Sequence, residues 1–259
     1  MLKITPIQAF DDNYIWLLQK PGCSVVAVVD PGDEDPVLDY LRSEGLTLGA
    51  VLITHKHGDH TGGVAELKAV YPDAVVFGPA NEDIRTVERR VSDCDSIELP
   101  EMQVSFQVME LPGHTEGHLA YLGEGVLFCG DTLFAAGCGR VFSGTHEQLH
   151  RSLQRIAALP PETQLYCAHE YTLANIGFAR WVEPENTAVS EREVDVRALR
   201  ERDEPTVPSS LELELQTNPF LRTGVAEVIA AASRYAGREL STGAEVFAAV
   251  RTWKDREYD

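Results

Sequence analysis

Three histidines and an aspartate lie within six consecutive positions of the chain: His55, His57, Asp59 and His60. The apolar run Ala50–Ile53 comes just before them, so a buried strand is predicted to end where these potential metal ligands begin. The first two histidines alternate as strand neighbours do and can face one cation, whereas Asp59 and His60 follow the bend at Gly58 and can face a second. The whole chain has only eight histidines, so this cluster indicates a metal site rather than a polar surface loop.

Three more potential ligands follow predicted strands elsewhere in the chain. His114, Asp131 and His169 come just after the strand-like runs at residues 102–111, 126–129 and 165–168. Because the ends of neighbouring strands meet at one edge of a sheet, side chains far apart in the sequence can gather there. Seven ligands are too many for one tetrahedral ion but suffice for two ions that share a carboxylate. Asp131 is the predicted bridge, since a carboxylate can offer one oxygen to each ion.

This ligand set predicts hydrolytic chemistry. Two cations about 3.5 to 4 Å apart can share a hydroxide, which is a strong nucleophile near neutral pH because bound water loses its proton easily. The ligands offer nitrogen and oxygen, which zinc, iron and manganese all accept. The five cysteines form no Cys-x-x-Cys pair, so the sequence predicts neither a thiolate metal site nor a framework of disulfides.

A second group of histidines has a more ordinary explanation. The run 146–150, His-Glu-Gln-Leu-His, matches the zinc-protease pattern in which two histidines one helical turn apart bind the metal. Thr145 and Gln148 have the spacing of a capping box, so His146 is expected in the first turn of an amphipathic helix. No convincing third ligand follows, and we interpret both histidines of the run as structural residues, and His118 likewise.

The elements that must position the ligands alternate between strands and helices in the first part of the chain. Strands are predicted at residues 2–4, 14–18, 25–29, 50–53 and 74–77. Helices are predicted from Asp35, as N-cap, to Gly45, and from Gly62 to the residue before Pro72. This alternation predicts a mixed fold of α and β layers.

Beyond His169 the strand signals fade. Helices are predicted at residues 174–182, 186–202, 210–216, 225–235 and 243–253. Ser209 with Glu212, and Thr242 with Glu245, have capping-box spacing and support the starts of two of these helices.

Length and composition fit a folded protein of one or two domains, with 259 residues of which 44% are hydrophobic. The change from strands to helices predicts a boundary near Tyr171, between a catalytic domain of residues 1–171 and a helical domain of residues 172–259. The helical domain includes a charged run at residues 191–204, which we interpret as the solvated face of a helix.

The net charge of −19 argues against nucleic acid as a partner and against anionic membrane surfaces, because both would repel the chain. No apolar run approaches the ~20 residues needed to cross a bilayer, and no targeting segment is expected at the start. We therefore expect a monomeric cytoplasmic protein whose partner is a small molecule.

The ligand loop, His-x-His-x-Asp-His followed by Thr61-Gly62-Gly63, resembles that of the metallo-β-lactamase superfamily. Pro112-Gly113-His114-Thr115 and Gly130-Asp131-Thr132 are similar to two further motifs of that superfamily. Six more segments resemble the glyoxalase II family of hydroxyacylglutathione hydrolases: residues 10–15, 30–32, 136–140, 169–172, 182–186 and 218–222. The resemblance runs from end to end and implies an α+β fold, an αββα sandwich followed by a C-terminal α-helical domain that contributes to glutathione binding.

The resemblance also implies an activity and a site. The family hydrolyses S-D-lactoylglutathione to D-lactate and glutathione, and it also cleaves related 2-hydroxyacylglutathiones. The reaction proceeds by attack of a metal-bridging hydroxide, and the hydrolysis is a step in methylglyoxal detoxification. Two divalent ions are implied, with zinc expected and iron or manganese as alternatives. One ion would be held by His55, His57 and His114, and the other by Asp59, His60 and His169. Asp131 would bridge them, and Asp59 and Asp131 would serve as catalytic residues. The glutathione-binding positions of the family fall on Arg140, Tyr171, Arg251 and Lys254.

Arg251 and Lys254 lie three residues apart on the last predicted helix, which places them on one face. An alternative hypothesis is a mononuclear-iron glutathione persulfide dioxygenase of the same superfamily. Such enzymes resemble this chain in the histidine loop but lack the long helical tail that carries Arg251 and Lys254. The resemblance therefore favours the thioester hydrolase.

Overall fold

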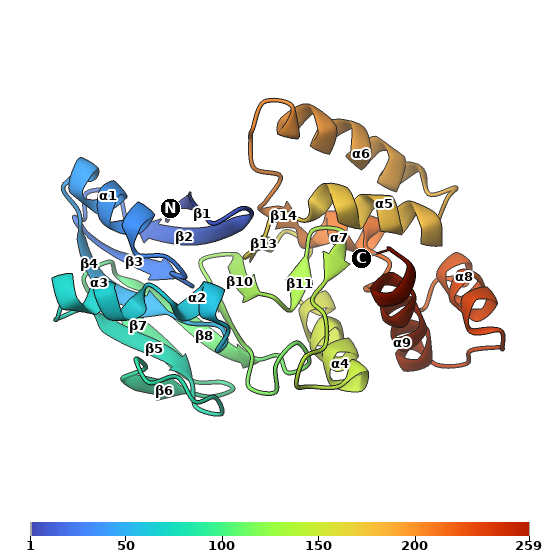
Figure 1. Ribbon diagram of the computed structural model, residues 1–259, viewed down its shortest axis with the longest axis horizontal. Helices are drawn as coiled ribbons and strands as arrows, with labels where there is room; N and C mark the ends of the chain where they lie inside the picture. The colour runs from blue at the N-terminus through green and yellow to red at the C-terminus, as the bar shows by residue number, and fades with distance from the viewer. Residues whose placement is uncertain (1, 259) are drawn as a thin grey trace. The chain divides into compact units, whose positions relative to one another are not determined.

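The computed structural model describes residues 2–258 of the chain. The backbone forms two compact units. Unit 1 comprises the residues up to Glu110 together with Thr115–Gly130, and unit 2 comprises Leu111–His114 together with the residues from Asp131 onwards. In Figure 1, most of unit 1 is coloured from blue to green and most of unit 2 from yellow-green to red.

The first sheet of unit 1 has the strand order β1-β2-β3-β4-β5-β6. Its strands are β1 (Lys3–Ala9), β2 (Asn13–Gln19), β3 (Val25–Val29), β4 (Thr47–Leu52), β5 (Val75–Pro79) and β6 (Arg89–Val91). The first three strands pair antiparallel, and neighbours from β3 to β6 are parallel. Parallel strands need crossover connections, and α1 (Asp35–Glu44) and α3 (Val64–Val70) lie on two of them.

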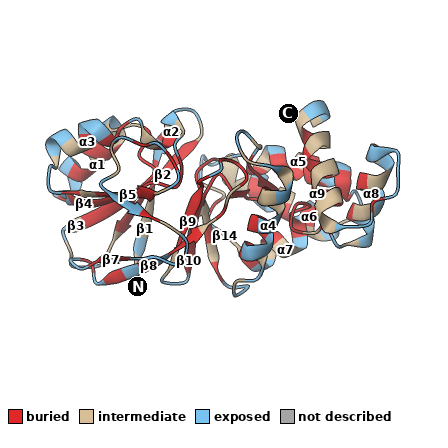
Figure 2. Ribbon diagram, turned by 90° about the horizontal axis from the view of Figure 1, so that it is seen from below, coloured by how far each residue is buried: buried red, intermediate tan, exposed pale blue. Residues whose placement is uncertain are grey.

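The middle of this sheet is buried on both faces, as expected for parallel strands covered by helices. Leu41 of α1 and Leu67 of α3 are fully buried and belong to the same apolar cluster as Val28 and Val51 of the sheet. The outer faces of both helices are exposed, whereas the strands beneath them are buried (Figure 2). The end of β4 is therefore anchored in a rigid core, which suits a strand that delivers the histidine loop.

The second sheet of unit 1 is antiparallel. It contains β7 (Ser96–Leu99), β8 (Val104–Glu110), β9 (Leu119–Gly123) and β10 (Val126–Gly130). Tyr121 of β9 crosses to the first sheet, where its hydroxyl donates to the carbonyl of Ile53 at 2.5 Å. The backbone N–H of Leu119 likewise donates to the carbonyl of Thr54 at 2.8 Å. Both hydrogen bonds come from β9, so the second sheet holds the backbone just before His55.

Unit 2 contains a short hairpin, a pair of strands and most of the helices. The hairpin is β11 (Leu133–Phe134) with β12 (Gly137–Cys138), and β13 (Gln164–Cys167) pairs antiparallel with β14 (Ser209–Ser210). The helices are α4 (His146–Ala157), α5 (Thr172–Val182), α6 (Thr187–Arg200), α7 (Leu211–Thr217), α8 (Ala226–Ala236) and α9 (Gly243–Trp253), and a π-helical turn follows at Lys254–Tyr258. Fully buried aromatic rings hold the helices together: Phe220 lies 6.1 Å from Phe178 and 5.8 Å from Phe247 between centroids.

The predicted helices beyond His169 are confirmed, with boundaries that differ by two residues or fewer. The capping box of Thr242 and Glu245 is present, as is that of Thr145 and Gln148. Between residues 2 and 258, no helix combines the length and apolar character needed to cross a membrane.

Two predicted helix starts are wrong. Ser209 lies in β14 and its hydroxyl donates to Glu214 at 2.6 Å, so the N-cap of α7 is Ser210, whose hydroxyl accepts from the N–H of Leu213 at 3.2 Å. Pairing with β13 holds Ser209 in an extended conformation, which the local pattern does not reveal. For α1, the N-cap is Glu34 rather than Asp35, one residue earlier than predicted.

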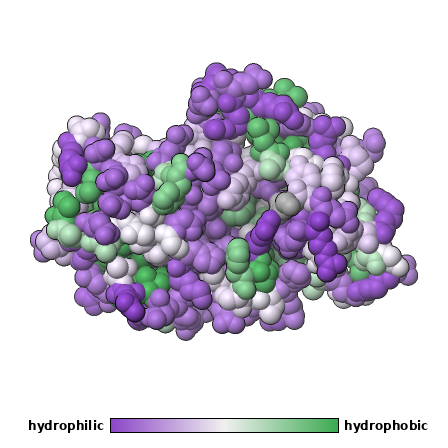
Figure 3. All heavy atoms as spheres, viewed as in Figure 1, coloured by the Kyte–Doolittle hydropathy of each residue, from purple (hydrophilic) through white to green (hydrophobic). Residues whose placement is uncertain are grey.

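The charged run 191–204 forms most of α6 and the turn that follows it. Glu191, Arg197 and Glu201 are exposed, and the surface over α6 is strongly hydrophilic (Figure 3). Arg192 is the exception, because only 5% of it is exposed and its guanidinium pairs with the buried carboxylate of Glu214 at 2.6 Å. The interpretation as a solvated face is therefore right for most of the run and wrong for Arg192.

Candidate functional site

The histidine loop leaves β4 and turns at once into a four-residue helix, α2 (Gly58–Thr61). We predicted a bend at Gly58, and the structure shows a helical turn that carries Asp59 and His60. His55 and His60 are completely buried, whereas His57 and Asp59 are half-buried. His55 and His60 therefore form the enclosed part of the loop, and His57 and Asp59 form the part that is accessible to solvent.

The four side chains of this loop form two pairs. Nε2 of His55 lies 3.0 Å from Nδ1 of His57, and Nε2 of His60 lies 3.3 Å from Oδ2 of Asp59. Donor atoms this close to one another within each pair can share one cation. The rings of His55 and His60 also lie close together, with 4.1 Å between centroids, so the division of the loop between two ions stays a prediction.

The chain approaches this loop closely at Gly32. A Cβ atom at Gly32 would lie 1.9 Å from the carbonyl oxygen of Asp59, so no other residue fits without moving the loop. Asn13 supports the same residue, because its amide nitrogen donates to Oδ2 of Asp59 at 3.1 Å. Both positions lie in segments whose sequence resembles the family, but no role was predicted for either residue.

Unit 2 brings together the other three predicted ligands. Oδ2 of Asp131 lies 3.5 Å from Nε2 of His114, and Oδ1 lies 3.4 Å from Nε2 of His169. All three residues are at most 7% exposed. Each carboxylate oxygen of Asp131 therefore faces a different histidine, which is the arrangement expected of a bridging carboxylate.

The hydrogen bonds of His114 show why a cation fits beside Asp131. Nδ1 of His114 contacts the backbone carbonyl of Arg140 at 2.8 Å, and since a carbonyl only accepts, Nδ1 carries the hydrogen. The neutral ring then presents the lone pair of Nε2 to the carboxylate. A neutral imidazole and a carboxylate that face each other offer two lone pairs to one cation, so the donor set suits a metal ion.

The predicted glutathione-binding residues all lie in unit 2, in two different environments. Arg140 is exposed and its Nε lies 3.8 Å from Asp255. Arg251 is only 1% exposed, and its guanidinium donates to the carbonyl of Cys138 at 3.0 Å and pairs with Asp255 at 2.8 Å. Lys254 is 6% exposed, with its ammonium 5.8 Å from the centre of the Tyr258 ring. Asp255 was not among the predicted site residues, although it directly follows Lys254.

Aromatic rings surround His169. Tyr171 stacks on His169 with 4.8 Å between centroids and an interplanar angle of 6°, and Phe134 of the hairpin lies edge-on to Tyr171 at 5.2 Å. Tyr171 is 36% exposed, so its ring is accessible from solvent next to a predicted metal ligand.

The remaining histidines behave as structural residues. His146 and His150 pack against the ring of Phe247, and Nε2 of His150 lies 3.3 Å from the hydroxyl of Thr223. Burial lowers the pKa of both histidines, as expected for imidazoles packed on an apolar ring. The buried ring of His118 stacks on His55 at 4.8 Å between centroids.

The buried cysteines are poor candidates for metal ligands. Burial raises the pKa of Cys138 to about 11 and that of Cys167 to about 12, so both remain neutral thiols near neutral pH. All five cysteines are free, in agreement with the prediction of no disulfide framework.

Two known protein families match consecutive parts of the chain. Residues 10–169 match the metallo-beta-lactamase superfamily, and residues 170–257 match the hydroxyacylglutathione hydrolase C-terminus. The hydroxyacylglutathione hydrolase of Pseudomonas fluorescens (strain SBW25) is 51% identical over 257 residues, which cover 99% of this chain and 100% of that protein.

Two solved structures share the fold. ETHE1 from Myxococcus xanthus is 26% identical with a TM-score of 0.60, and the match covers 86% of this chain and 99% of that one. TTHA1623 in a di-iron-bound form is 25% identical with a TM-score of 0.59, and the match covers 83% and 99% of the two chains. The chain therefore has the predicted metallo-β-lactamase fold followed by a helical C-terminal region, and it belongs to the hydroxyacylglutathione hydrolases, enzymes of the metallo-β-lactamase superfamily.

Proposed function

We propose that the chain hydrolyses S-D-lactoylglutathione, and related 2-hydroxyacylglutathiones, to D-lactate and glutathione. The observation that carries this proposal is the identity of 51% to a hydroxyacylglutathione hydrolase along the full length of both chains. The match of residues 170–257 to the C-terminal region of that family adds support. We place the functional boundary at Tyr171, close to where the two family matches meet.

The proposal includes two divalent ions, with zinc expected and iron or manganese as alternatives. We assign His55, His57 and His114 to one ion and Asp59, His60 and His169 to the other, with Asp131 between them. The close pairs within the histidine loop and the two faces of Asp131 support this division. The di-iron form of TTHA1623 shows that a protein of this fold can bind two ions.

When bound, the two ions supply an activated water molecule and polarise the thioester carbonyl. The side chain of Asp59 is 42% exposed, so its carboxylate is available to take the proton from the attacking water. A bond forms between the water oxygen and the carbonyl carbon, and the carbon–sulfur bond breaks. The sulfur leaves as a thiolate, which is a good leaving group, so no protonated side chain is needed beside it.

A paired assay separates this function from a persulfide dioxygenase. Purified zinc-loaded protein is expected to cleave S-D-lactoylglutathione in the absence of oxygen. The same protein, and a separate sample loaded with iron, should consume no oxygen when given glutathione persulfide. Oxygen uptake without thioester cleavage would identify the chain as a dioxygenase. If neither activity is found, the chain would be a metal-binding protein without catalytic function.

Glutathione binding is proposed to depend on Arg140, Tyr171, Arg251 and Lys254. The substrate carries two carboxylates against one ammonium, so the net charge of −19 opposes its approach and local cations must compensate. Arg140 is the most exposed of these cations, whereas buried Arg251 is better suited to hold the segment at Cys138 through its carbonyl. The same net charge keeps copies of the chain apart, in line with the monomeric cytoplasmic enzyme that we expect.

Arg140→Glu is expected to raise KM by about 10-fold or more while kcat stays within a few-fold. The reason is that a carboxylate of the glutathione part does not change during the reaction, so its contact is equally strong in the ground and transition states. Added salt should raise the KM of the wild type more than that of the variant. The matched control is Arg180→Glu. Arg180 is also about half exposed and pairs with a glutamate, Glu193, and its substitution changes the net charge by the same amount. Equal KM values for both variants would remove Arg140 from the substrate site.

A further inference from the structure

Asp30 is a buried carboxylate that the proposed reaction does not use. It follows β3 and is 4% exposed. Oδ1 accepts from the backbone N–H of Thr54 at 2.7 Å, and Oδ2 lies 2.7 Å from the hydroxyl of Thr54 and 3.0 Å from Nδ1 of His60. Its backbone has a φ of 53°, in the left-handed region, which costs a non-glycine residue about 1 kcal/mol or more. Asp30 therefore adopts a costly conformation and makes three hydrogen bonds there.

The direction of the hydrogen bonds fixes the ring of His55. The Thr54 hydroxyl has one hydrogen, which it donates to Asp30, and the same oxygen lies 3.1 Å from Nδ1 of His55. The hydroxyl can therefore only accept from His55, so Nδ1 carries the hydrogen. Nε2 of His55 is left with its lone pair, and this is the atom that lies 3.0 Å from Nδ1 of His57.

The same carboxylate fixes the ring of His60 directly. An ionised carboxylate only accepts, so Nδ1 of His60 donates to Asp30, and in the neutral ring Nε2 then keeps its lone pair. Nε2 is also the atom that lies 3.3 Å from Oδ2 of Asp59. In both rings the nitrogen nearest to the other loop ligands is thus the one able to bind a cation.

We propose that Asp30 is a positioning residue that sets one ligand of each metal ion, His60 by direct contact and His55 through Thr54. This inference rests on the proposed division of His55 and His60 between two ions. A carboxylate that accepts from a ligating imidazole orients the ring and makes its other nitrogen more basic. One carboxylate contacts His60 directly and His55 through Thr54. Loss of the carboxylate should therefore weaken the binding of both ions, whereas loss of the Thr54 hydroxyl should weaken the binding of one.

The packing around Thr54 holds the hydroxyl in this chain of bonds. Gly130 has a φ of +48°, and a Cβ at this position would lie 2.4 Å from the Thr54 hydroxyl and 2.8 Å from Nε2 of His118. The ring of His118 in turn stacks on His55. A residue with a side chain at position 130 would therefore press against the Thr54 hydroxyl, and glycine avoids this clash.

The test is a titration of metal-free protein with zinc ions in competition with a coloured chelator, which gives a dissociation constant for each ion. The wild type is expected to bind two zinc ions. Thr54→Val should raise the dissociation constant of one zinc ion by about 10- to 100-fold. Asp30→Asn should raise both dissociation constants, because an amide group has only one oxygen that can accept. Thr54→Ser keeps the hydroxyl and should restore values close to wild type. Thr163→Val removes a buried hydroxyl from unit 2 and should change neither constant.

The outcomes separate this inference from the proposed metal centre. Wild-type protein that binds fewer than two zinc ions would overturn the metal centre and this inference with it. Two ions in the wild type, with unchanged constants in folded Asp30→Asn and Thr54→Val, would overturn only the role of Asp30. Equal weakening of both ions by Thr54→Val would show that the threonine acts through general packing rather than through His55. If Asp30→Asn does not fold, the contrast between Thr54→Val and Thr54→Ser decides the matter.

Discussion

Asp131→Asn is expected to lower kcat/KM by at least about 10³-fold, which corresponds to about 4 kcal/mol of transition-state stabilisation. The two carboxylate oxygens of Asp131 face His114 and His169 at 3.5 and 3.4 Å. Asparagine keeps the shape but offers one oxygen and an N–H donor, so one of the two histidines would face a group that cannot bind the cation. Bound zinc should fall from two equivalents to one or fewer, which elemental analysis of dialysed protein would measure.

The matched control for Asp131→Asn is His150→Ala. His150 belongs to the protease-like run, but its ring packs on Phe247 and its Nε2 contacts Thr223. This variant is expected to retain two zinc ions and wild-type turnover. Loss of zinc from His150→Ala would mean that the metal lies at the protease-like run. Full zinc content and activity in Asp131→Asn would exclude Asp131 as the bridge.

The candidate metal ligands could be identified from the sequence because the information is local. Four candidate ligands lie within six positions, from His55 to His60, and the other three each follow a recognisable strand. The helical turn α2 was missed, since four residues are too few to show a helical period. Asp30 lies 24 residues from Thr54 and 30 from His60, so no sequence pattern marks their hydrogen bonds. The carboxylate that orients two ligands therefore emerges only from the fold.

The charges of the C-terminal half were harder to predict. The spacing of Arg251 and Lys254 places them on one face, but periodicity does not say whether that face is covered. The structure buries Arg251 between the carbonyl of Cys138 and Asp255, so it is not an ordinary solvated cation. Arg192 was likewise hidden in a charged run that is otherwise exposed. In both cases the charge is buried because it has a carboxylate partner that was not predicted, Glu214 for Arg192 and Asp255 for Arg251.

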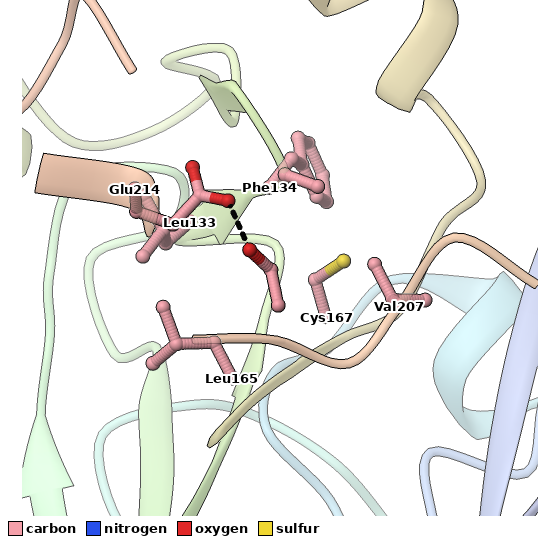
Figure 4. A pocket seen from close by; sticks show the side chains of 8 residues that line it. Leu133, Phe134, Leu165, Cys167, Val207 and Glu214 are labelled. Atoms are coloured by element: carbon pink, nitrogen blue, oxygen red, sulfur yellow. Dashed lines mark hydrogen bonds between the residues drawn. The ribbon is translucent and has the colours of Figure 1, made fainter. Parts of the chain in front are cut away.

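Glu214 is the buried partner of Arg192, and it also holds the hairpin after Asp131. It is 0% exposed, and Oε1 accepts from Arg192 and from Ser209 at 2.6 Å each. Oε2 accepts from the backbone N–H of Ala136 at 2.8 Å and from Asn218 at 3.0 Å. Figure 4 shows Glu214 beside Leu133 and Phe134, with a dashed line for the bond from Ser209.

The hairpin needs this support. Ala136, at its tip, has a φ of 56°, a left-handed conformation that is costly for alanine. Asn218 adds bonds to the carbonyls of Phe134 at 3.2 Å and Gly137 at 2.9 Å, and Asn175 adds one to the carbonyl of Ala135 at 3.0 Å. Since Asp131 lies just before the hairpin and Arg140 just after it, the helical region helps to place both.

Glu214→Gln is expected to destabilise the protein by about 3–5 kcal/mol, because the substitution leaves the buried guanidinium of Arg192 without its counter-charge. The loss would be measured by urea denaturation. At a temperature where the variant stays folded, KM should also rise several-fold, because the hairpin that carries Phe134 and leads to Arg140 is held less firmly. A hydrogen bond from the Ala136 N–H to a neutral amide oxygen is weaker than one to a carboxylate.

Glu183→Gln distinguishes the hairpin effect from general loss of stability. Glu183 is also buried, at 4% exposed, and pairs with Arg222 at 2.8 Å in the same unit. The carboxylate of Glu183 accepts from Arg222 and Asn186, neither of which belongs to the hairpin. Both variants should lose stability, but only Glu214→Gln should change KM. If the two variants lose stability and keep the same KM, Glu214 supports the fold alone, and the placement of Arg140 must come from Asp255 and from the carbonyl contact with His114.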